Sequence, residues 1–140
     1  MLKALDSARK SGDDIPVGAV IVKDGKVIAQ AHNEKEARND VSAHAEILAI
    51  RKAEEITGNW RLNGCEMYVT LEPCPMCMWA ILQSRIDRLF FGSYDTVYGA
   101  LSVLPEMITM SNSKLYHKGG IMEQECDSIL NEYFNKMRAR

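Results

Sequence analysis

The sequence predicts an α/β domain whose sheet contains both antiparallel and parallel strands and whose helices cover both faces. Residues 17–22 and 26–31 are rich in β-branched side chains, and Asp24-Gly25 between them is a strong signal for a two-residue hairpin turn. Strand-like runs at 66–71 and 88–92 flank a helical segment, which favours parallel pairing and a right-handed crossover. These patterns place a hairpin and a β-α-β unit in one sheet.

Two central helices follow from their end signals. Ser42 is expected to cap a helix that runs to about Thr57, where Gly58 suits the left-handed position after the last turn. Pro75 fits the first position of a second helix, which runs to about Ser84. The crossover between the two parallel strands is therefore helical.

The two ends of the chain are also predicted to be helical. Apolar residues over 2–8 recur near helical spacing and indicate a short opening helix, and the same spacing returns over 121–140. The pattern over 94–120 is weak, with scattered Gly, Ser and Asn. Residues 1–140 are expected to form one domain, because this is the length of an ordinary domain.

Composition restricts the class of protein. The chain is 46% hydrophobic and has a formal net charge of -2, so a polyanionic partner would need a local basic patch. The apolar run Met76–Leu82 is far shorter than the roughly 18 residues of a membrane helix, so no membrane partner is expected. Residues 1–6 carry charges at short intervals, unlike a secretory signal. A cytoplasmic location with reduced cysteines is expected.

Cys74 and Cys77 form the strongest chemical motif. Their spacing at a helix start places both sulfurs on one face, within reach of one ion. Taken alone, the pair is also compatible with two packed thiols or a redox couple. His44 and Glu46 open the preceding helix, and helix starts that follow neighbouring strands converge at one edge of a sheet. His44, Cys74 and Cys77 are therefore predicted to bind a metal.

Three ligands leave a zinc ion one open position, which is typical of a catalytic site. Such an ion lowers the pKa of its water from 15.7 toward about 7, and Glu46 is placed to move the proton. A fourth ligand would instead close a structural site, giving a non-catalytic zinc-stabilised binding module. The possible fourth ligands lack ligand spacing and are interpreted as packing or surface residues: Cys65, Cys126, His32 and His117.

The motifs His44-Ala45-Glu46 and Pro73-Cys74-Pro75-Met76-Cys77 resemble the cytidine deaminase superfamily. Within it, the chain is most similar to bacterial tRNA-specific adenosine deaminases, and the similarity runs through Pro16-Val17-Gly18 and Asn59-Trp60-Arg61-Leu62 to the closing helix. The resemblance implies a three-layer α/β/α fold with a mixed sheet of about five strands. It also implies a homodimer with one Zn²⁺ per subunit.

The resemblance further implies a reaction and a set of roles. Hydroxide activated by zinc would attack C6 of the wobble adenosine in a tRNA anticodon loop, with Glu46 as the proton shuttle and inosine as the product. By position, His44, Cys74 and Cys77 are the metal ligands. Asn33 and Ala45 would contact the base, and Asp95 would lie near the ribose.

Departures from the family keep a second substrate class open. The chain has Asn112-Ser113-Lys114 where the family usually has Asn-His-Arg, and Gly99-Ala100-Leu101-Ser102 where a Gly-Ser pair is usual; its opening helix is also short. The alternative is a deaminase of a free nucleobase, nucleoside or nucleotide. Cations that could meet RNA gather late in the chain, although they also suit a solvated helix end: Lys114, Lys118, Lys136, Arg138 and Arg140.

Overall fold

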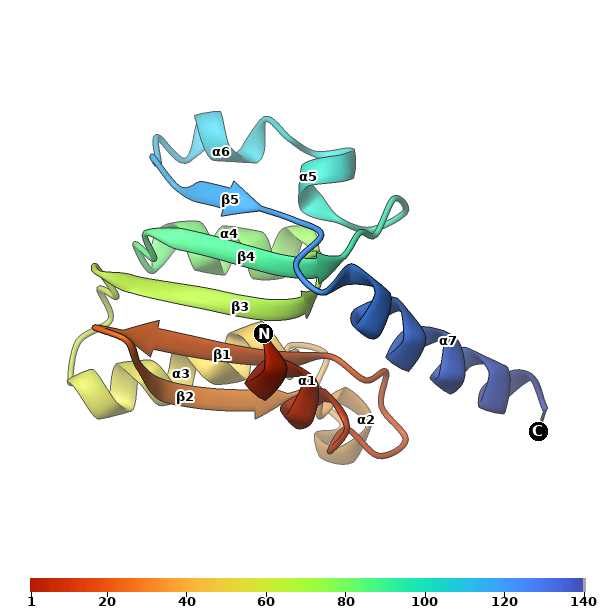
Figure 1. Cartoon of the computed structure of the whole chain (residues 1–140). Coiled ribbons are helices and arrows are strands. Elements are labelled where there is room, and N and C mark those ends of the chain that lie inside the picture. The colour runs from red at the N-terminus through yellow and green to blue at the C-terminus, as the bar shows by residue number, and fades with distance from the viewer. Residues whose placement is uncertain (140) are drawn as a thin grey trace.

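The structure, a computed structural model, describes residues 1–139 as a five-stranded sheet between two layers of helices (Figure 1). The strands are β1 (Gly18–Lys23), β2 (Lys26–His32), β3 (Cys65–Leu71), β4 (Arg88–Ser93) and β5 (Tyr116–Lys118). Their order in the sheet is β2-β1-β3-β4-β5. β1 is antiparallel to β2 and β3, whereas β3, β4 and β5 are parallel. The predicted mixed sheet is confirmed.

Helices lie on both faces of this sheet. In Figure 1, α3 (Ala45–Thr57) and α4 (Pro75–Gln83) lie behind it, and α1 (Leu2–Ala8) and α7 (Glu123–Arg138) lie in front. Three four-residue helices complete the described residues: α2 (Lys35–Arg38), α5 (Ala100–Val103) and α6 (Met107–Met110). The three-layer α/β/α architecture is the one expected.

Local signals explain the hairpin and the end of α3. Asp24 and Gly25 both have positive φ, 51° and 76°, and Lys23 pairs with Lys26, as a two-residue turn requires. Gly58 ends α3 in the left-handed conformation with φ 67°. Both predictions are confirmed.

The predicted capping role of Ser42 is wrong. α3 begins at Ala45, and the residue at its N-cap is His44. The Ser42 hydroxyl instead donates a hydrogen bond of 2.8 Å to Asp40 Oδ1, within the turn that precedes the helix. Because its hydroxyl is bonded to Asp40 and the helix begins three residues further on, Ser42 does not cap α3.

Apolar side chains from the sheet and from α3 and α4 form the core. Leu48, Met67, Val69, Met78 and Ile81 are each at most 3% exposed. Full burial of one such side chain contributes about 1.5–3 kcal/mol, so α3 and α4 are firmly attached to the sheet. Within residues 1–139, no helix has both the length and the apolar character needed to span a membrane.

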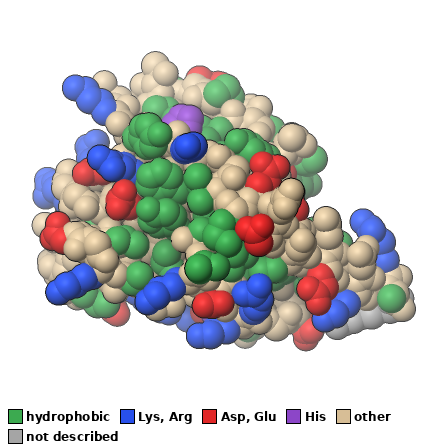
Figure 2. Space-filling view, viewed as in Figure 1, with side chains coloured by type: hydrophobic (Ala, Val, Ile, Leu, Met, Phe, Trp, Pro, Cys, Tyr) green, Lys and Arg blue, Asp and Glu red, His purple; other side chains and the backbone are tan. Residues whose placement is uncertain are grey.

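The face of the sheet that α1 and α7 cover in part also carries aromatic side chains. Figure 2 shows hydrophobic side chains gathered over the middle of this face. Tyr68, Phe90 and Tyr116 come from β3, β4 and β5, with ring centroids 4.9 Å and 6.0 Å apart along the row. These contacts tie the parallel strands together.

The topology brings several chain segments together at one end of the strands. β3 and β4 end there, and because β1 and β2 form an antiparallel hairpin beside them, β1 begins and β2 ends there too. The segments that follow or precede these strand ends carry Val17, Asn33, Glu72 and Asp95. In wound α/β sheets, ligands bind at the carboxyl ends of the strands.

Candidate metal centre and active site

His44 and Cys74 occupy equivalent positions at the starts of two neighbouring helices. His44 is the N-cap of α3, and Cys74 is the N-cap of α4, with Pro75 in the first turn. Both residues have extended backbones, with ψ 151° and 168°. Cys77 lies one turn along α4, so its side chain projects on the same side as Cys74. The two helix starts meet, as the sequence pattern indicates.

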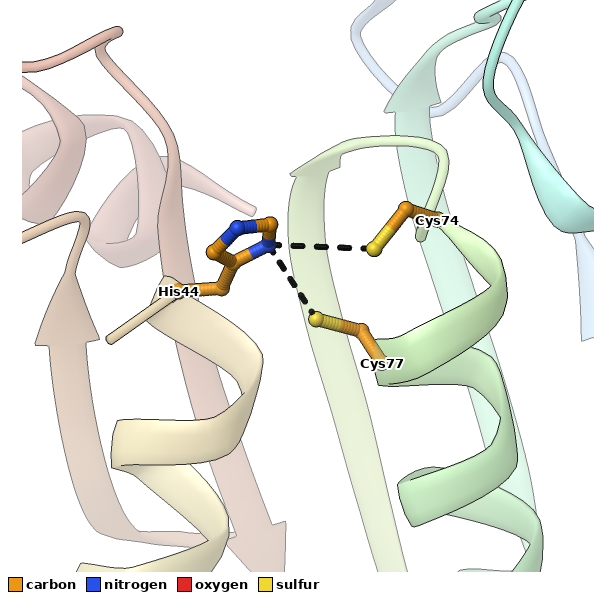
Figure 3. A group of neighbouring side chains, drawn as sticks. All are labelled: His44, Cys74 and Cys77. Carbon is orange, nitrogen blue, oxygen red and sulfur yellow. Dashed lines mark hydrogen bonds between the residues drawn. The ribbon is translucent and has the colours of Figure 1, made fainter. Parts of the chain in front are cut away.

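The three side chains point toward one another (Figure 3). His44 Nδ1 lies 3.7 Å from Cys74 Sγ and 3.4 Å from Cys77 Sγ, and all three ligand atoms lie within 4.8 Å of one another. In a tetrahedral zinc site with bonds of about 2.3 Å to sulfur and about 2.0 Å to nitrogen, ligand atoms are about 3.5–3.8 Å apart. One imidazole and two thiols at these distances fit a single zinc ion.

The two thiols have different acidities because they interact with each other. A hydrogen bond from Cys77, reinforced by His44, lowers the pKa of Cys74 to about 4 despite its partial burial. The same hydrogen bond to Cys74, together with burial, raises the pKa of Cys77. The hydrogen bond to Cys74 also raises the pKa of His44. A thiolate beside a thiol and an imidazole is a set of donors prepared for a cation.

Glu46 lies in the first turn of α3, next to the three ligand residues, and is 4% exposed. Burial raises its pKa to about 7, against the effect of His44 and of a hydrogen bond from Cys77. A carboxyl group with this pKa both accepts and donates a proton at neutral pH. Its place beside the metal ligands therefore suits proton transfer.

A cavity of about 490 Å³ opens over this group, within the size range of small-molecule sites. Its lining includes His44, Glu46 and Cys74, together with Asn33, Glu72 and Asp95 from the surrounding segments. The structure thus places two of the three predicted ligands, the predicted proton carrier and two predicted substrate contacts around one space, with Cys77 buried behind it.

Asn33 bridges two segments at the cavity. Its Oδ1 accepts a hydrogen bond of 2.9 Å from the Ala45 N–H, and its Nδ2 donates one of 3.0 Å to the Ile15 carbonyl. A carboxamide has two N–H donors and two acceptor lone pairs, so one of each is left for a substrate. Ala45 is buried and its N–H is engaged by Asn33. The predicted contact of Ala45 with the base stays a prediction.

Asp95 belongs to an irregular segment that follows β4. Its Oδ1 accepts hydrogen bonds from the N–H groups of Val97 and Tyr98, at 3.1 Å and 2.9 Å. Its own N–H donates to Glu72 Oε1 at 3.1 Å. Asp95 lines the cavity, and Tyr98, which is 70% exposed, lines it beside Asp95.

Glu72 and Tyr133 are cavity residues to which sequence reasoning gave no role. Glu72 is 2% exposed although it carries a charge, and the only signal for it in the sequence is its place between β3 and the metal-binding turn. The Tyr133 hydroxyl donates 2.9 Å to the Asp13 carbonyl and so joins α7 to the segment before β1. Neither contact could be inferred from spacing along the chain.

The possible fourth ligands lie elsewhere. Among residues 1–139, His44, Cys74 and Cys77 are the only group of three or more side chains that could share a metal. Cys65 is the first residue of β3, at the end of that strand away from the metal group, and Cys126 is buried on α7. His32 Nδ1 lies 3.1 Å from the Asn33 carbonyl, and His117 is exposed on β5. None of these four side chains joins the metal group.

The late cations do not form one cluster. Lys114 lies with Asn63 and Arg85 around a small surface cavity at the starts of β3, β4 and β5, the end of the strands opposite the metal group. The loop Asn112-Ser113-Lys114 is therefore remote from the 490 Å³ cavity of its own chain. Lys136 pairs with Glu132 at 3.8 Å on the exposed side of α7, and Arg138 follows it. Arg140 lies outside the described residues.

Three comparisons with known proteins agree with this site. Residues 1–93 match the model of the cytidine and deoxycytidylate deaminase zinc-binding region. The chain is 38% identical to a tRNA-specific adenosine deaminase of Bacillus subtilis, over its whole length and 89% of that protein. It is also similar to a structure from a study of tRNA:A34 deaminases, with 43% identity and a TM-score of 0.89 over 93% of this chain and 97% of that one.

The fold and the metal group thus define a zinc-binding α/β/α domain whose three ligand side chains lie beside a cavity. Because the family model covers residues 1–93 and full-length relatives exceed 30% identity, the chain belongs to the cytidine and deoxycytidylate deaminase family. A guanine deaminase from Bacillus subtilis is a further structural relative, with 43% identity and a TM-score of 0.64 over 66% of this chain and 61% of that one.

Proposed function

We propose that this protein hydrolytically deaminates adenosine to inosine at the wobble position of tRNA anticodons. The observation that carries the proposal is the arrangement of His44, Cys74 and Cys77 around one point, with the buried Glu46 carboxyl beside them and the cavity above. When bound there, zinc supplies a water whose pKa is lowered toward about 7. The reaction exchanges the amino group on C6 of adenine for oxygen and releases ammonia.

The side chains of the cavity divide the remaining work. Glu46 accepts one proton from the attacking water and delivers it to a ring nitrogen of adenine; it then carries the second proton, from the hydroxyl on C6, to the amine, which leaves as ammonia. Asn33, held by Ala45 and Ile15, offers one donor and one acceptor to the polar edge of the base. Asp95 would face the ribose from the segment after β4.

The choice of tRNA is supported by how far each similarity extends. The tRNA deaminase relatives match nearly the whole chain, including the segments that surround the cavity after residue 93. The guanine deaminase matches two-thirds of the chain with a lower TM-score. A free purine base is the second candidate substrate, because that relative has the same sequence identity over the part it matches.

The experiment incubates the purified zinc protein with bulk tRNA, with an anticodon stem-loop carrying a wobble adenosine, and with free adenine, guanine, cytosine and their nucleosides. Inosine in digested RNA and released ammonia are measured. Glu46→Ala serves as the inactive control, and its zinc content is determined alongside. We expect inosine in tRNA and no ammonia from the free compounds. Ammonia from the free compounds alone would overturn the proposed substrate.

We also propose that the protein is a cytoplasmic homodimer. The four cysteines are free thiols, which supports a reducing compartment. The homodimer is the state that the resemblance to the deaminase family implies. Light scattering should give twice the chain mass of 15.7 kDa. A mass of one chain at working concentration would contradict the dimer.

A further inference from the structure

The segment 94–102, which carries Asp95 to the cavity, has little regular structure of its own. It runs from the end of β4 to the short helix α5, and Tyr94, Val97 and Tyr98 are more than half exposed. Ala100 at its far end is 1% exposed and belongs to the core, but none of residues 94–98 around Asp95 is buried. Hydrogen bonds to neighbouring segments must therefore fix the position of this part.

A single buried carboxylate supplies most of these bonds. Glu72 Oε1 accepts the Asp95 N–H at 3.1 Å, and Oε2 accepts the Ser102 N–H at 3.0 Å. The Ser102 hydroxyl lies 3.0 Å from both carboxylate oxygens. The two ends of the segment are thus bound to one side chain that is 2% exposed.

Close packing at Gly99 fits the segment around this carboxylate. A Cβ atom at Gly99 would lie 2.1 Å from Glu72 Oε2 and 2.3 Å from the Asp95 carbonyl oxygen, which is closer than any real contact. Backbone bonds add to the attachment, since the Ala100 N–H donates to the Pro73 carbonyl at 2.8 Å. The carboxylate is enclosed by the segment that it holds.

We propose that Glu72 is a positioning residue for the substrate: it holds the segment 94–102, and with it Asp95, where the ribose of a polynucleotide substrate binds. The inference rests on the proposed function, in which Asp95 faces the ribose. Glu72 takes no part in the hydrolysis. Losing its carboxylate therefore weakens substrate binding more than it slows the chemical step.

The principal variant is Glu72→Gln, which keeps the size of the side chain but replaces one acceptor oxygen by an NH₂ group. Whichever oxygen is replaced, the NH₂ group faces a backbone N–H, that of Asp95 or that of Ser102, so part of the attachment is lost. Glu66→Gln is the matched control, because it makes the same chemical change near the start of β3, at the other end of this strand from Glu72. There Glu66 lies 3.7 Å from Arg88.

Kinetics with the wobble-adenosine stem-loop should show a KM about ten-fold or more above wild type for Glu72→Gln, with kcat within about three-fold. Zinc content should stay at one per chain. Hydrogen–deuterium exchange should be faster at the Asp95 and Ser102 amides in the free enzyme. Glu66→Gln should match wild type in all four measurements.

Several results would overturn the inference. One is an unchanged KM together with unchanged hydrogen–deuterium exchange. Another is a loss of zinc or of kcat without a rise in KM, and this second result would show that Glu72 acts through Cys74. If Glu72→Gln does not fold, Ser102→Ala removes one donor from the same carboxylate and must raise KM in the same direction. Wild-type enzyme that fails to deaminate the stem-loop would refute the proposed function, whereas active wild type with these variant results refutes the role of Glu72 alone.

Discussion

Replacing Glu46 by Gln separates the proton-transfer role of this residue from its place in the fold. The variant keeps the shape of a side chain that is 4% exposed but removes its ability to take up a proton. Loss of general acid–base catalysis costs about 10² to 10⁴ in turnover, which is about 2.7 to 5.4 kcal/mol of barrier. Zinc should remain at one per chain, because His44, Cys74 and Cys77 are unchanged.

The same variant should stabilise the zinc-free protein above neutral pH. Burial raises the pKa of Glu46 from 4.5 to about 7, so the carboxylate form is disfavoured in the folded state. The contribution of this group to stability is complete below pH 4.5 and is lost as the pH rises through 7. At about 1.4 kcal/mol for each unit of pKa, the loss approaches about 3 kcal/mol. Glu46→Gln does not titrate and avoids it.

Two measurements test this reasoning. Turnover is followed by inosine formation in the stem-loop, and the free energy of unfolding is followed by urea titration of the zinc-free protein at pH 5 and pH 8. We expect a turnover at least about 100-fold below wild type and a stability difference that grows in favour of the variant at pH 8. Wild-type turnover in a variant that retains zinc would refute the proton-transfer role of Glu46.

Three further predictions concern the metal, the closing helix and the segment before β1. Cys77→Ala should reduce bound zinc to well below one per chain by metal analysis, because it removes one of three ligands. Gly92→Ala should cost about 1–3 kcal/mol of unfolding free energy, since its Cβ would lie 2.2 Å from the Cys126 sulfur on α7; a wild-type denaturation midpoint would contradict this packing. Asp14→Ala should lower the free energy of unfolding by about 1–2 kcal/mol, because the buried Asp14 carboxylate accepts two N–H groups of α2 at 2.8 Å and 3.3 Å. Asp14→Asn keeps an acceptor and should lose less unfolding free energy in the same denaturant titration.

The metal group could be predicted from the sequence because its signals are local. Cys74 and Cys77 are one helical turn apart, and Pro75 marks where that helix starts. His44 and Glu46 lie within one turn of another helix start. Since both helices belong to a sheet with parallel strands, their starts fall on one edge. The prediction that Ser42 caps the helix failed because its hydroxyl bonds the carboxylate of Asp40, two residues earlier in the chain, instead of the helix start.

The elements that were not predicted depend on partners distant in the chain. β5 has three exposed residues, and it forms because the unpaired edge of β4 accepts Tyr116 beside Arg88 and Lys118 beside Phe90. The helices α2, α5 and α6 are four residues long, too short for a periodic apolar pattern. The role of Glu72 is hidden for the same reason, because its donors lie 23 and 30 residues further on.

In the proposed function, chemistry and substrate choice are carried by different parts of this site. The metal ligands and Glu46 lie at the starts of α3 and α4, both fixed to the apolar core, whereas Asp95 lies among the exposed residues 94–98 of the segment 94–102. Residues 99–102 of that segment are also one of the places where the sequence departs from its family. Its attachment to Glu72 uses two backbone N–H groups, which any residue but proline provides, and one serine hydroxyl. Side chains along the segment can therefore vary with the RNA while the carboxylate beside the metal ligands keeps it in register.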